Sequence, residues 1–273
     1  MPLCNMRDLL NDARKGNYAV GSFSVANLES VMGVIAAAEE MRAPIILQCA
    51  ETRLKHHPLK LLGPLMIAAA KSASVPVAVH LDHGTTIACV QEALALGFTS
   101  VMIDGSHHPI EENLSMVRHV VEMAKTTGAC VEAEVGRVGR GEDGSDSPMV
   151  AASLDDCILM DQTGLDALAV GIGNAHGLYA ATPELRYDIL EQLNGKLGAH
   201  LVLHGGTGLT DEQFIKLISL GMRKINIATD IFRAAAMASH GDDIFSNITS
   251  SAAAVKAVTQ KYIALFGSAG KAE

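Results

Sequence analysis

Side chains that bind metals or move protons stand at the ends of short apolar runs in this chain. Asp82 and His83 follow the run "VPVAVHL", and Asp104 ends the run "SVMID". Other imidazoles and carboxylates take corresponding places later in the sequence, at Glu132, Glu134, His176 and His204. Because a buried ionisable group without a partner is costly, such a set is not expected to gather by chance. These residue types favour acid–base chemistry and metal binding.

Three of the imidazoles form a predicted metal site. His83, His176 and His204 would supply three neutral nitrogens and leave a fourth position open, as in catalytic zinc sites. They are too far apart in the sequence for a local motif, so the prediction requires a fold that brings them to one place. The adjacent pair His107–His108 is expected to be a loop feature instead.

Eight short apolar runs, separated by segments of helical spacing, predict the elements that position these residues. The runs are Tyr18–Phe23, Pro44–Cys49, Val75–Asp82, Ser100–Asp104, Cys130–Val135, Ala167–Ile172, Leu201–Gly206 and Lys224–Thr229. Most are apolar throughout, which is typical of parallel strands covered on both faces. The alternation predicts βαβ units, and eight units favour a closed (β/α)8 TIM barrel, with a doubly wound open sheet as the alternative. We expect a single catalytic domain over residues 1–273.

Local signals predict helix boundaries and one long loop. Asn27 is expected to cap the helix "LESVMGVIAAAEEM", and Thr210 or Asp211 to cap "EQFIKLISLG". The segment 136–153 is rich in glycine and charge, and loops of this length are usually functional or mobile. We therefore predict a mobile catalytic loop over about residues 136–153. The C-terminal "LFGSAGKAE" is expected to fray after a last helix.

Two glycine-rich turns favour a phosphorylated substrate. The turn "HGGTG" (His204–Gly208) follows the seventh run, and "NIAT" (Asn226–Thr229) ends the eighth. In a barrel, the carboxyl ends of the strands form the active-site face. The loops after the seventh and eighth strands often bind phosphate there, because backbone N–H groups and a helix N-terminus face the anion.

The composition limits the class of partner. The 273 residues are 49% hydrophobic, which is enough for a large core, and the net charge of −9 argues against nucleic-acid and anionic membrane surfaces. The chain lacks both a signal-peptide pattern and an apolar run of the roughly 20 residues that span a membrane. Its five scattered cysteines suit reduced thiols. We expect a cytoplasmic protein that acts on a small molecule, without nucleic-acid or membrane partners.

The motifs "HLDHG", "SVMIDGSH", "VEAEVG", "GEDG", "AVGIGNAHG", "LVLHGGTG" and "KINIAT" occur in this order along the chain. Over essentially its whole length the sequence resembles the class II, metal-dependent fructose-bisphosphate and tagatose-bisphosphate aldolase family. The resemblance implies a homodimeric or homotetrameric lyase that reversibly cleaves a ketose (bis)phosphate to dihydroxyacetone phosphate and an aldehyde. It also implies Zn²⁺ and, for some members, a monovalent cation (Na⁺ or K⁺) near the glycines.

The same resemblance implies roles for individual residues. Asp82 corresponds to the catalytic acid/base, and Glu142 to a mobile loop glutamate that moves the proton at C1 of dihydroxyacetone phosphate. The implied zinc ligands are His83, His176 and His204, with Asp104 and Glu134 at a second or alternative metal position. The implied phosphate and triose contacts are Gly177, Gly205, Gly206, Thr207, Asn226, Ile227, Ala228 and Thr229.

Several positions depart from the family pattern. Ser24 stands where many members have Asn, Ala50 where Ser is common, and Ala228 where fructose-bisphosphate enzymes have Asp; Arg140 interrupts a usual double glycine. The triose-phosphate half of the site therefore matches better than the half that contacts the aldehyde. Arg53 is a candidate for selecting an anionic group at that far end.

Two interpretations of the segment around Arg53 stay open. With Lys55, His56 and His57 it could form an anion-binding loop or a solvated basic turn. For the whole chain, the alternatives are an aldolase for another ketose 1-phosphate or for a keto-sugar-acid phosphate, a zinc hydrolase, and a non-catalytic sugar-phosphate-binding subunit. A Schiff-base aldolase is disfavoured, because Lys224 begins its predicted strand and is expected to face the opposite end of the barrel.

Overall fold

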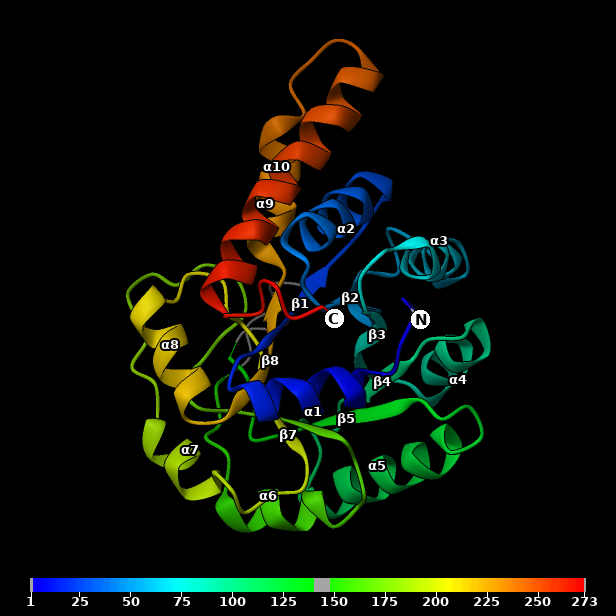
Figure 1. Cartoon of the computed structure of the whole chain (residues 1–273). Coiled ribbons are helices and arrows are strands. Elements are labelled where there is room, and N and C mark those ends of the chain that lie inside the picture. The colour runs from blue at the N-terminus through cyan, green and yellow to red at the C-terminus, as the bar shows by residue number, and fades with distance from the viewer. Residues whose placement is uncertain (1, 140–147, 273) are drawn as a thin grey trace.

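Each predicted apolar run overlaps a strand in the computed structural model, which describes residues 2–139 and 148–272 (Figure 1). The strands are β1 (Val20–Ser24), β2 (Ile45–Ala50), β3 (Val77–Gly84), β4 (Ser100–Ile103), β5 (Cys130–Val135), β6 (Ala167–Val170), β7 (His200–Leu203) and β8 (Met222–Ile227). All neighbouring strands pair in parallel, and β1 pairs with β8. This closure confirms the (β/α)8 barrel and excludes the open sheet.

Helices surround the barrel and connect its strands. They are α1 (Met6–Gly16), α2 (Leu28–Met41), α3 (Leu59–Ser72), α4 (Ile87–Leu96), α5 (Ile110–Ala124), α6 (Leu154–Asp161), α7 (Tyr187–Leu193), α8 (Asp211–Ser219), α9 (Thr229–Ala238) and α10 (Ile244–Leu265), with a 3₁₀ turn at Glu51–Arg53. The predicted caps are confirmed: Asn27 caps α2 through Ser30, and Thr210 caps α8 through Gln213. In both, the side chains satisfy backbone N–H groups that a helix start leaves unpaired.

Helix α1 closes one end of the barrel (Figure 1). Its buried face, formed by Met6, Leu9, Leu10 and Ala13, packs on an apolar layer contributed by the strands. That layer consists of Val20, Ile46, Ala78, Cys130, Ala167, Ala169 and Val202. The strands reach this layer before their polar ends, so α1 lies at the end opposite the candidate site residues.

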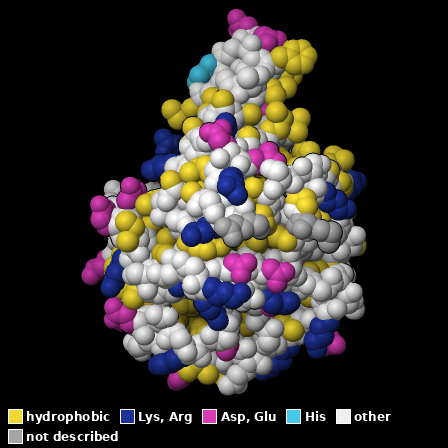
Figure 2. All heavy atoms as spheres, in the orientation of Figure 1, with side chains coloured by type: hydrophobic (Ala, Val, Ile, Leu, Met, Phe, Trp, Pro, Cys, Tyr) yellow, Lys and Arg dark blue, Asp and Glu magenta, His cyan; other side chains and the backbone are white. Residues whose placement is uncertain are grey.

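Helices α9 and α10 form an arm that projects beyond the barrel (Figure 1). Apolar side chains are visible along this arm in Figure 2, and Met237, Ile244 and Phe245 are among the exposed ones. On the rest of the face drawn there, cationic and acidic side chains are interspersed. None of the helices within the described residues combines the length and apolar character needed to cross a membrane.

The C-terminal segment is ordered by backbone hydrogen bonds, so the expectation that it frays is wrong. After α10, Phe266 is buried and its carbonyl accepts from the N–H of Ala19. The N–H of Gly270 donates to Met41 at the end of α2. The segment thereby joins the last helix of the fold to the first strand and to α2.

Candidate active site

Strand β3 ends in a bulge that lets two consecutive residues contact the same site. In a regular strand, neighbouring side chains point to opposite faces. The pairing of β3 with β4 shifts register between Leu81 and Gly84, and His83 has a φ of 42°. Bulges re-aim side chains, and here Asp82 and His83 both contact groups at the carboxyl ends of the strands. A Cβ at Gly84 would lie 2.5 Å from the carbonyl oxygen of Met102, which explains the glycine.

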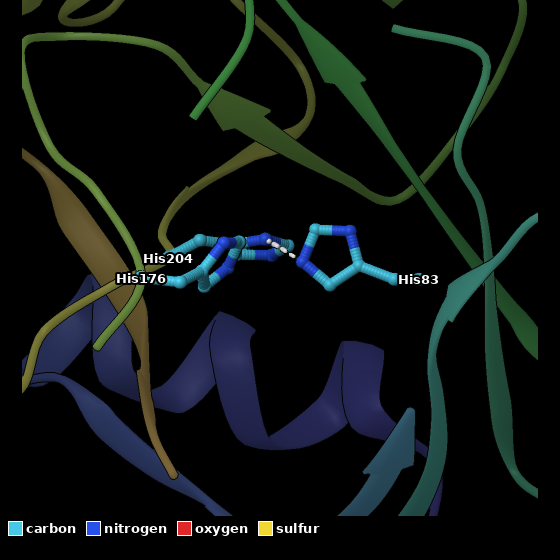
Figure 3. Close-up of side chains that lie close together, drawn as sticks. All are labelled: His83, His176 and His204. Atoms are coloured by element: carbon cyan, nitrogen blue, oxygen red, sulfur yellow. Dashed lines mark hydrogen bonds between the residues drawn. The ribbon is translucent and has the colours of Figure 1, made fainter. Parts of the chain in front are cut away.

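The three predicted histidines converge at this end of the barrel (Figure 3). Their ligand atoms all lie within 4.8 Å of one another, and all three side chains are buried. His83 comes from β3, His204 directly follows β7, and His176 lies in the loop after β6, where its N–H donates to Gly139. His83 Nε2 lies 2.8 Å from His204 Nδ1. Three neutral nitrogens in this arrangement suit a tetrahedral metal site with an open position.

Carboxylates hold the outer nitrogens of two of these histidines. His83 Nδ1 lies 2.7 Å from Asp104 Oδ2, and His204 Nε2 lies 2.9 Å from Glu132 Oε1. Metal-binding histidines usually make such contacts, which fix the ring and its tautomer. Burial opposes a charge on His83, but Asp82 and the hydrogen bond to Asp104 outweigh it and hold its pKa well above the usual value. Burial and the neighbouring His83 hold the pKa of His204 well below the usual value.

Asp104 and Glu134 form a second possible metal group with His83, and the ligand atoms of this group also lie within 4.8 Å of one another. Burial and the charge of Asp104 raise the pKa of Glu134 to about 8. Burial raises the pKa of Asp104, but its hydrogen bond to His83 outweighs this and lowers it. Two carboxyl groups therefore lie beside His83, and the three side chains together form a donor set for a cation.

Asp82 is fully buried, and amide donors hold both of its oxygens. Gln48 Nε2 donates to Oδ2 at 2.9 Å, and Asn226 Nδ2 donates to Oδ1 at 3.1 Å. Gln48 Nε2 also donates to Ser24 Oγ at 3.0 Å, so Ser24 belongs to the same network. Gln48 was not among the predicted site residues. Its signal was an amide inside the otherwise apolar run Pro44–Cys49.

The two glycine-rich turns lie beside the histidines. Gly205 has a φ of 64°, and a Cβ there would lie 2.2 Å from the carbonyl oxygen of Ala175. Gly206 follows in the same turn, and Gly177, after His176, has a φ of 79°. These positions permit close backbone approach that other residues would block.

Buried polar atoms in the same region lack a partner within the described residues: Thr207 Oγ1 and Asn226 Oδ1. Ile227 is buried at the end of β8, Ala228 precedes α9, and Thr229 is its first residue. Asn226–Thr229 thus lead into the N-terminus of α9, where no side chain in the described part of the chain caps the helix, and the N–H of Gly206 in the other turn donates to Asn226.

The predicted loop 136–153 is described only at its two ends. Glu142 and Arg140 lie outside the described residues, as does the centre of the predicted loop. At the ends of that loop, the N–H of Arg137 donates to Val150 and the N–H of Val150 donates to Arg137. His107 and His108 are exposed after β4, which confirms them as a loop feature.

Arg53 follows β2 on the same rim, where its guanidinium carbon lies 5.7 Å from the ring centre of Phe232. Lys55 and His56 are exposed in this turn, and Ala50 is buried at the end of β2.

The expectation for Lys224 is wrong. Strand β8 begins at Met222, so Lys224 is its third residue rather than its first. The side chain is fully buried inside the barrel, with Nζ 2.9 Å from Glu132 Oε2. Lys224 does not face the opposite end; it is tied into the group that holds His204.

Comparisons with known proteins agree with this geometry. The family model described as "Fructose-bisphosphate aldolase class-II" matches residues 4–271. The 6-phospho-5-dehydro-2-deoxy-D-gluconate aldolase of Halalkalibacterium halodurans is 40% identical over 240 residues, covering 86% of this chain and 83% of that protein. The fructose-bisphosphate aldolase of Geobacillus stearothermophilus is 42% identical over 237 residues, covering 84% and 82%. The solved YdjI aldolase from Escherichia coli K12 is similar with a TM-score of 0.91 and 34% identity, covering 99% and 100%.

Proposed function

The chain belongs to the class II fructose-bisphosphate aldolase family of lyases, and from this premise we propose that it cleaves a ketose (bis)phosphate reversibly to dihydroxyacetone phosphate and an aldehyde. The observation that carries the proposal is the cluster of His83, His176 and His204 beside Asp82 at the carboxyl ends of the strands. This reaction requires an acid/base residue beside a metal site and a phosphate-binding turn, and the cluster combines them.

The donor set fits the zinc ion on which this family depends. His83, His176 and His204 would hold it, and Asp104 and Glu134 are the proposed ligands of a second or alternative position. When bound, zinc supplies a Lewis acid that stabilises negative charge developing on the substrate's carbonyl oxygen. The carboxylate of Asp104 on the outer nitrogen of His83 keeps that ring oriented for this role.

Asp82 is the proposed acid/base at the bond that breaks. In the cleavage direction it would take the proton of the C4 hydroxyl, and in the condensation direction it would return it. The amide donors of Gln48 and Asn226 accept no proton, so they orient the carboxylate without competing for its task. General acid–base catalysis of this kind contributes about 10²–10⁴ in rate.

Glu142 is the proposed proton donor to C1 of the triose phosphate once the aldehyde has formed. This role follows from its place in the "GEDG" motif of the segment 136–153, which we propose to act as a mobile loop. Exclusion of water by such a loop would protect the reactive carbanion. The Glu142→Ala variant is expected to lose proton exchange at C1 of dihydroxyacetone phosphate more completely than it loses bond cleavage.

The substrate's phosphate is proposed to bind between the two glycine-rich turns. Gly177, Gly205 and Gly206 allow close approach, and the N-terminus of α9 offers backbone N–H groups just after Asn226, whose carbonyl accepts from Gly206. Anions bind favourably at helix N-termini because unpaired N–H groups point at them. A Na⁺ or K⁺ ion near these glycines, and a homodimer or homotetramer, remain predictions from the family.

The residues near the far end of the substrate bear on which aldehyde is released. By the family resemblance, Ala50 stands where Ser is common and Ala228 where fructose-bisphosphate enzymes have Asp, and Arg53 follows β2 on the same rim. A ketose phosphate with an anionic far end would suit Arg53, whose planar guanidinium binds carboxylate or phosphate in a bidentate manner. This observation keeps a keto-sugar-acid phosphate as the second candidate beside tagatose- or fructose-1,6-bisphosphate.

The deciding experiment is a screen for release of dihydroxyacetone phosphate by the zinc-loaded protein. The panel contains fructose- and tagatose-1,6-bisphosphate, ketose 1-phosphates whose far end is uncharged, and 6-phospho-5-dehydro-2-deoxy-D-gluconate. Release from at least one substrate is expected, and substrates with an anionic far end should have the highest kcat/KM. A zinc-loaded protein that releases no dihydroxyacetone phosphate from any of them contradicts the proposed reaction.

A further inference from the structure

A second group of polar side chains lies inside the barrel, one layer deeper than the candidate active site. Its members are His80, Glu132 and Lys224, and none has any solvent exposure. Each stands two residues before a rim residue of the same strand, so it points to the same face one layer further in. Side chains in the interior layers of such barrels are mostly branched and apolar. The proposed reaction chemistry uses none of these three residues.

Glu132 determines which nitrogen of His204 faces the other histidines. Its Oε1 lies 2.9 Å from His204 Nε2, whereas His204 Nδ1 lies 2.8 Å from His83 Nε2 on the opposite side of the ring. An ionised carboxylate can only accept hydrogen bonds, and a neutral imidazole carries one N–H. The hydrogen of His204 therefore lies on Nε2, and the lone pair on Nδ1 points toward His83.

Lys224 fixes Glu132 in turn. Its Nζ lies 3.1 Å from Oε1 and 2.9 Å from Oε2 of Glu132, so the ammonium contacts both carboxylate oxygens. The ring of His80 completes the enclosure: Nε2 lies 3.7 Å from Glu132 Oε2, and Nδ1 lies 2.8 Å from Ser100 Oγ. Glu132 thus carries its negative charge next to His204 while the pair as a whole adds no net charge to the barrel interior.

Stability does not explain this arrangement. Desolvation of two charges offsets their attraction, and apolar replacements of similar volume are often neutral or stabilising. Contact with His204 does explain it. Resting on the proposed function, we infer that Glu132, held by Lys224, is a positioning residue that orients His204 for metal binding. Partners of this kind typically change metal affinity by about 10–100-fold.

The test compares metal affinity with fold stability in paired variants. Glu132→Leu with Lys224→Met replaces the pair by apolar side chains, and Glu132→Gln with Lys224→Met keeps an acceptor atom without the charges. Zn²⁺ affinity is measured by competition with a chelator, the Co²⁺ absorption spectrum reports the ligand geometry, and thermal unfolding reports the fold. The control replaces the exposed pair Glu122–Lys125 by Gln and Met.

We expect both double variants to fold and to bind Zn²⁺ about 10–100-fold more weakly than the wild type, with the Gln variant less affected. The control should bind as the wild type does. If the Leu variant fails to fold, the Gln variant decides the question. Wild-type affinity in a folded double variant overturns this inference alone. A wild-type chain that binds no zinc overturns the proposed metal site and this inference together.

Discussion

The two ends of the barrel use the same strands for opposite purposes. At the closed end, Leu9 and Leu10 of α1 pack on an apolar layer, and Arg7 pairs with Asp166 at 2.5 Å. At the open rim, the strands end in imidazoles, carboxylates and glycine turns, and the buried Thr207 and Asn226 have polar atoms without partners in the part of the chain that the structure describes. The closed end is held mainly by apolar packing, although His200 Nδ1 and Arg223 Nε are buried there without a hydrogen-bond partner among the described residues. The rim instead gathers ligand-type side chains and hydrogen-bonding capacity in one place.

This difference indicates that stability and chemistry are separated along the barrel axis. Residues at the closed end should maintain the fold, whereas residues at the rim should determine the reaction and its substrate. This division is typical of (β/α)8 barrels. If the separation holds, rim variants should lose activity without unfolding, and variants at the closed end should lose stability without losing turnover.

The largest expected effect is at the rim. Removal of metal by prolonged chelation should abolish release of dihydroxyacetone phosphate, because the Lewis acid is lost, while thermal unfolding still shows a folded barrel. Re-addition of Zn²⁺ should restore activity. His83→Ala should behave like the chelated protein, and His108→Ala, in the exposed loop after β4, should behave like the wild type. Full activity in the metal-free protein would contradict the assignment.

Asp82→Asn is expected to lower kcat by about 10²–10⁴ because it removes the proposed acid/base. Zinc stoichiometry and melting temperature should stay close to wild-type values, since Asn keeps the shape of the side chain and a rotated Asn226 amide can accept a hydrogen bond from its new N–H group. Asp12→Asn, an exposed substitution on α1, is the control. An unchanged kcat for Asp82→Asn would make this carboxylate structural and would weaken the contrast between the two ends.

At the closed end, Leu10→Ala should lower the free energy of unfolding by about 2–5 kcal/mol, the usual cost of such a cavity. Leu10 is fully buried between α1 and the apolar layer. Its kcat, measured well below the melting temperature, should equal that of the wild type. Leu61→Ala, at an exposed position of α3, controls for the substitution itself. A large loss of kcat in folded Leu10→Ala protein would show that the two ends are coupled.

Arg53→Ala should raise KM for the intact ketose phosphate by about 10–100-fold, the effect of losing a hydrogen bond to a charged group. Affinity for dihydroxyacetone phosphate should not change, because that half of the substrate binds at the glycine turns. Lys60→Ala, exposed on α3, serves as the control. Equal affinities of wild type and Arg53→Ala for both ligands would identify the turn after β2 as a solvated basic turn.

The smallest expected effect is a pH dependence at the closed end. Burial and the nearby Arg14 lower the pKa of His200 to about 4 from the usual 6.5. Between these values the unfolded chain binds a proton that the folded chain does not, so stability falls as pH falls. His200→Gln should remove about 1–2 kcal/mol of the loss between pH 8 and pH 5. Identical pH profiles from denaturant titration would show that His200 contributes nothing.

The sequence predicted most of the fold because the barrel strands are buried on both faces. Such strands stand out as apolar runs, and eight of them with helices between leave few architectures. Helix α1 was missed, although Met6, Leu9, Leu10 and Ala13 have the spacing of a helical face. The spacing of these residues predicts a helix with one buried face. It does not indicate that this face packs against the end of a barrel.

The histidines of the site could be predicted from the sequence, but the layer of side chains beneath them could not. Strand ends of a parallel barrel meet at one rim, so His83, His176 and His204 could be brought together from the chain alone. Lys224 was misplaced because its layer depends on where β8 begins and on the stagger between strands, neither of which is visible in the sequence. The contact of Lys224 with Glu132 could not be predicted for the same reason.

The closing helix also has a consequence for how the chain is made. Hydrogen bonds join Asn5 to Gly128, Arg7 to Asp166 and Arg14 to Ala199, over separations of 123, 159 and 185 residues. During synthesis α1 leaves the ribosome long before β5, β6 and β7 exist, and its apolar face has nothing to cover. Contacts between residues so far apart in the sequence form slowly, and the apolar surface that they bury stays exposed until then. Nascent chains stalled before β7 should therefore engage chaperones through α1.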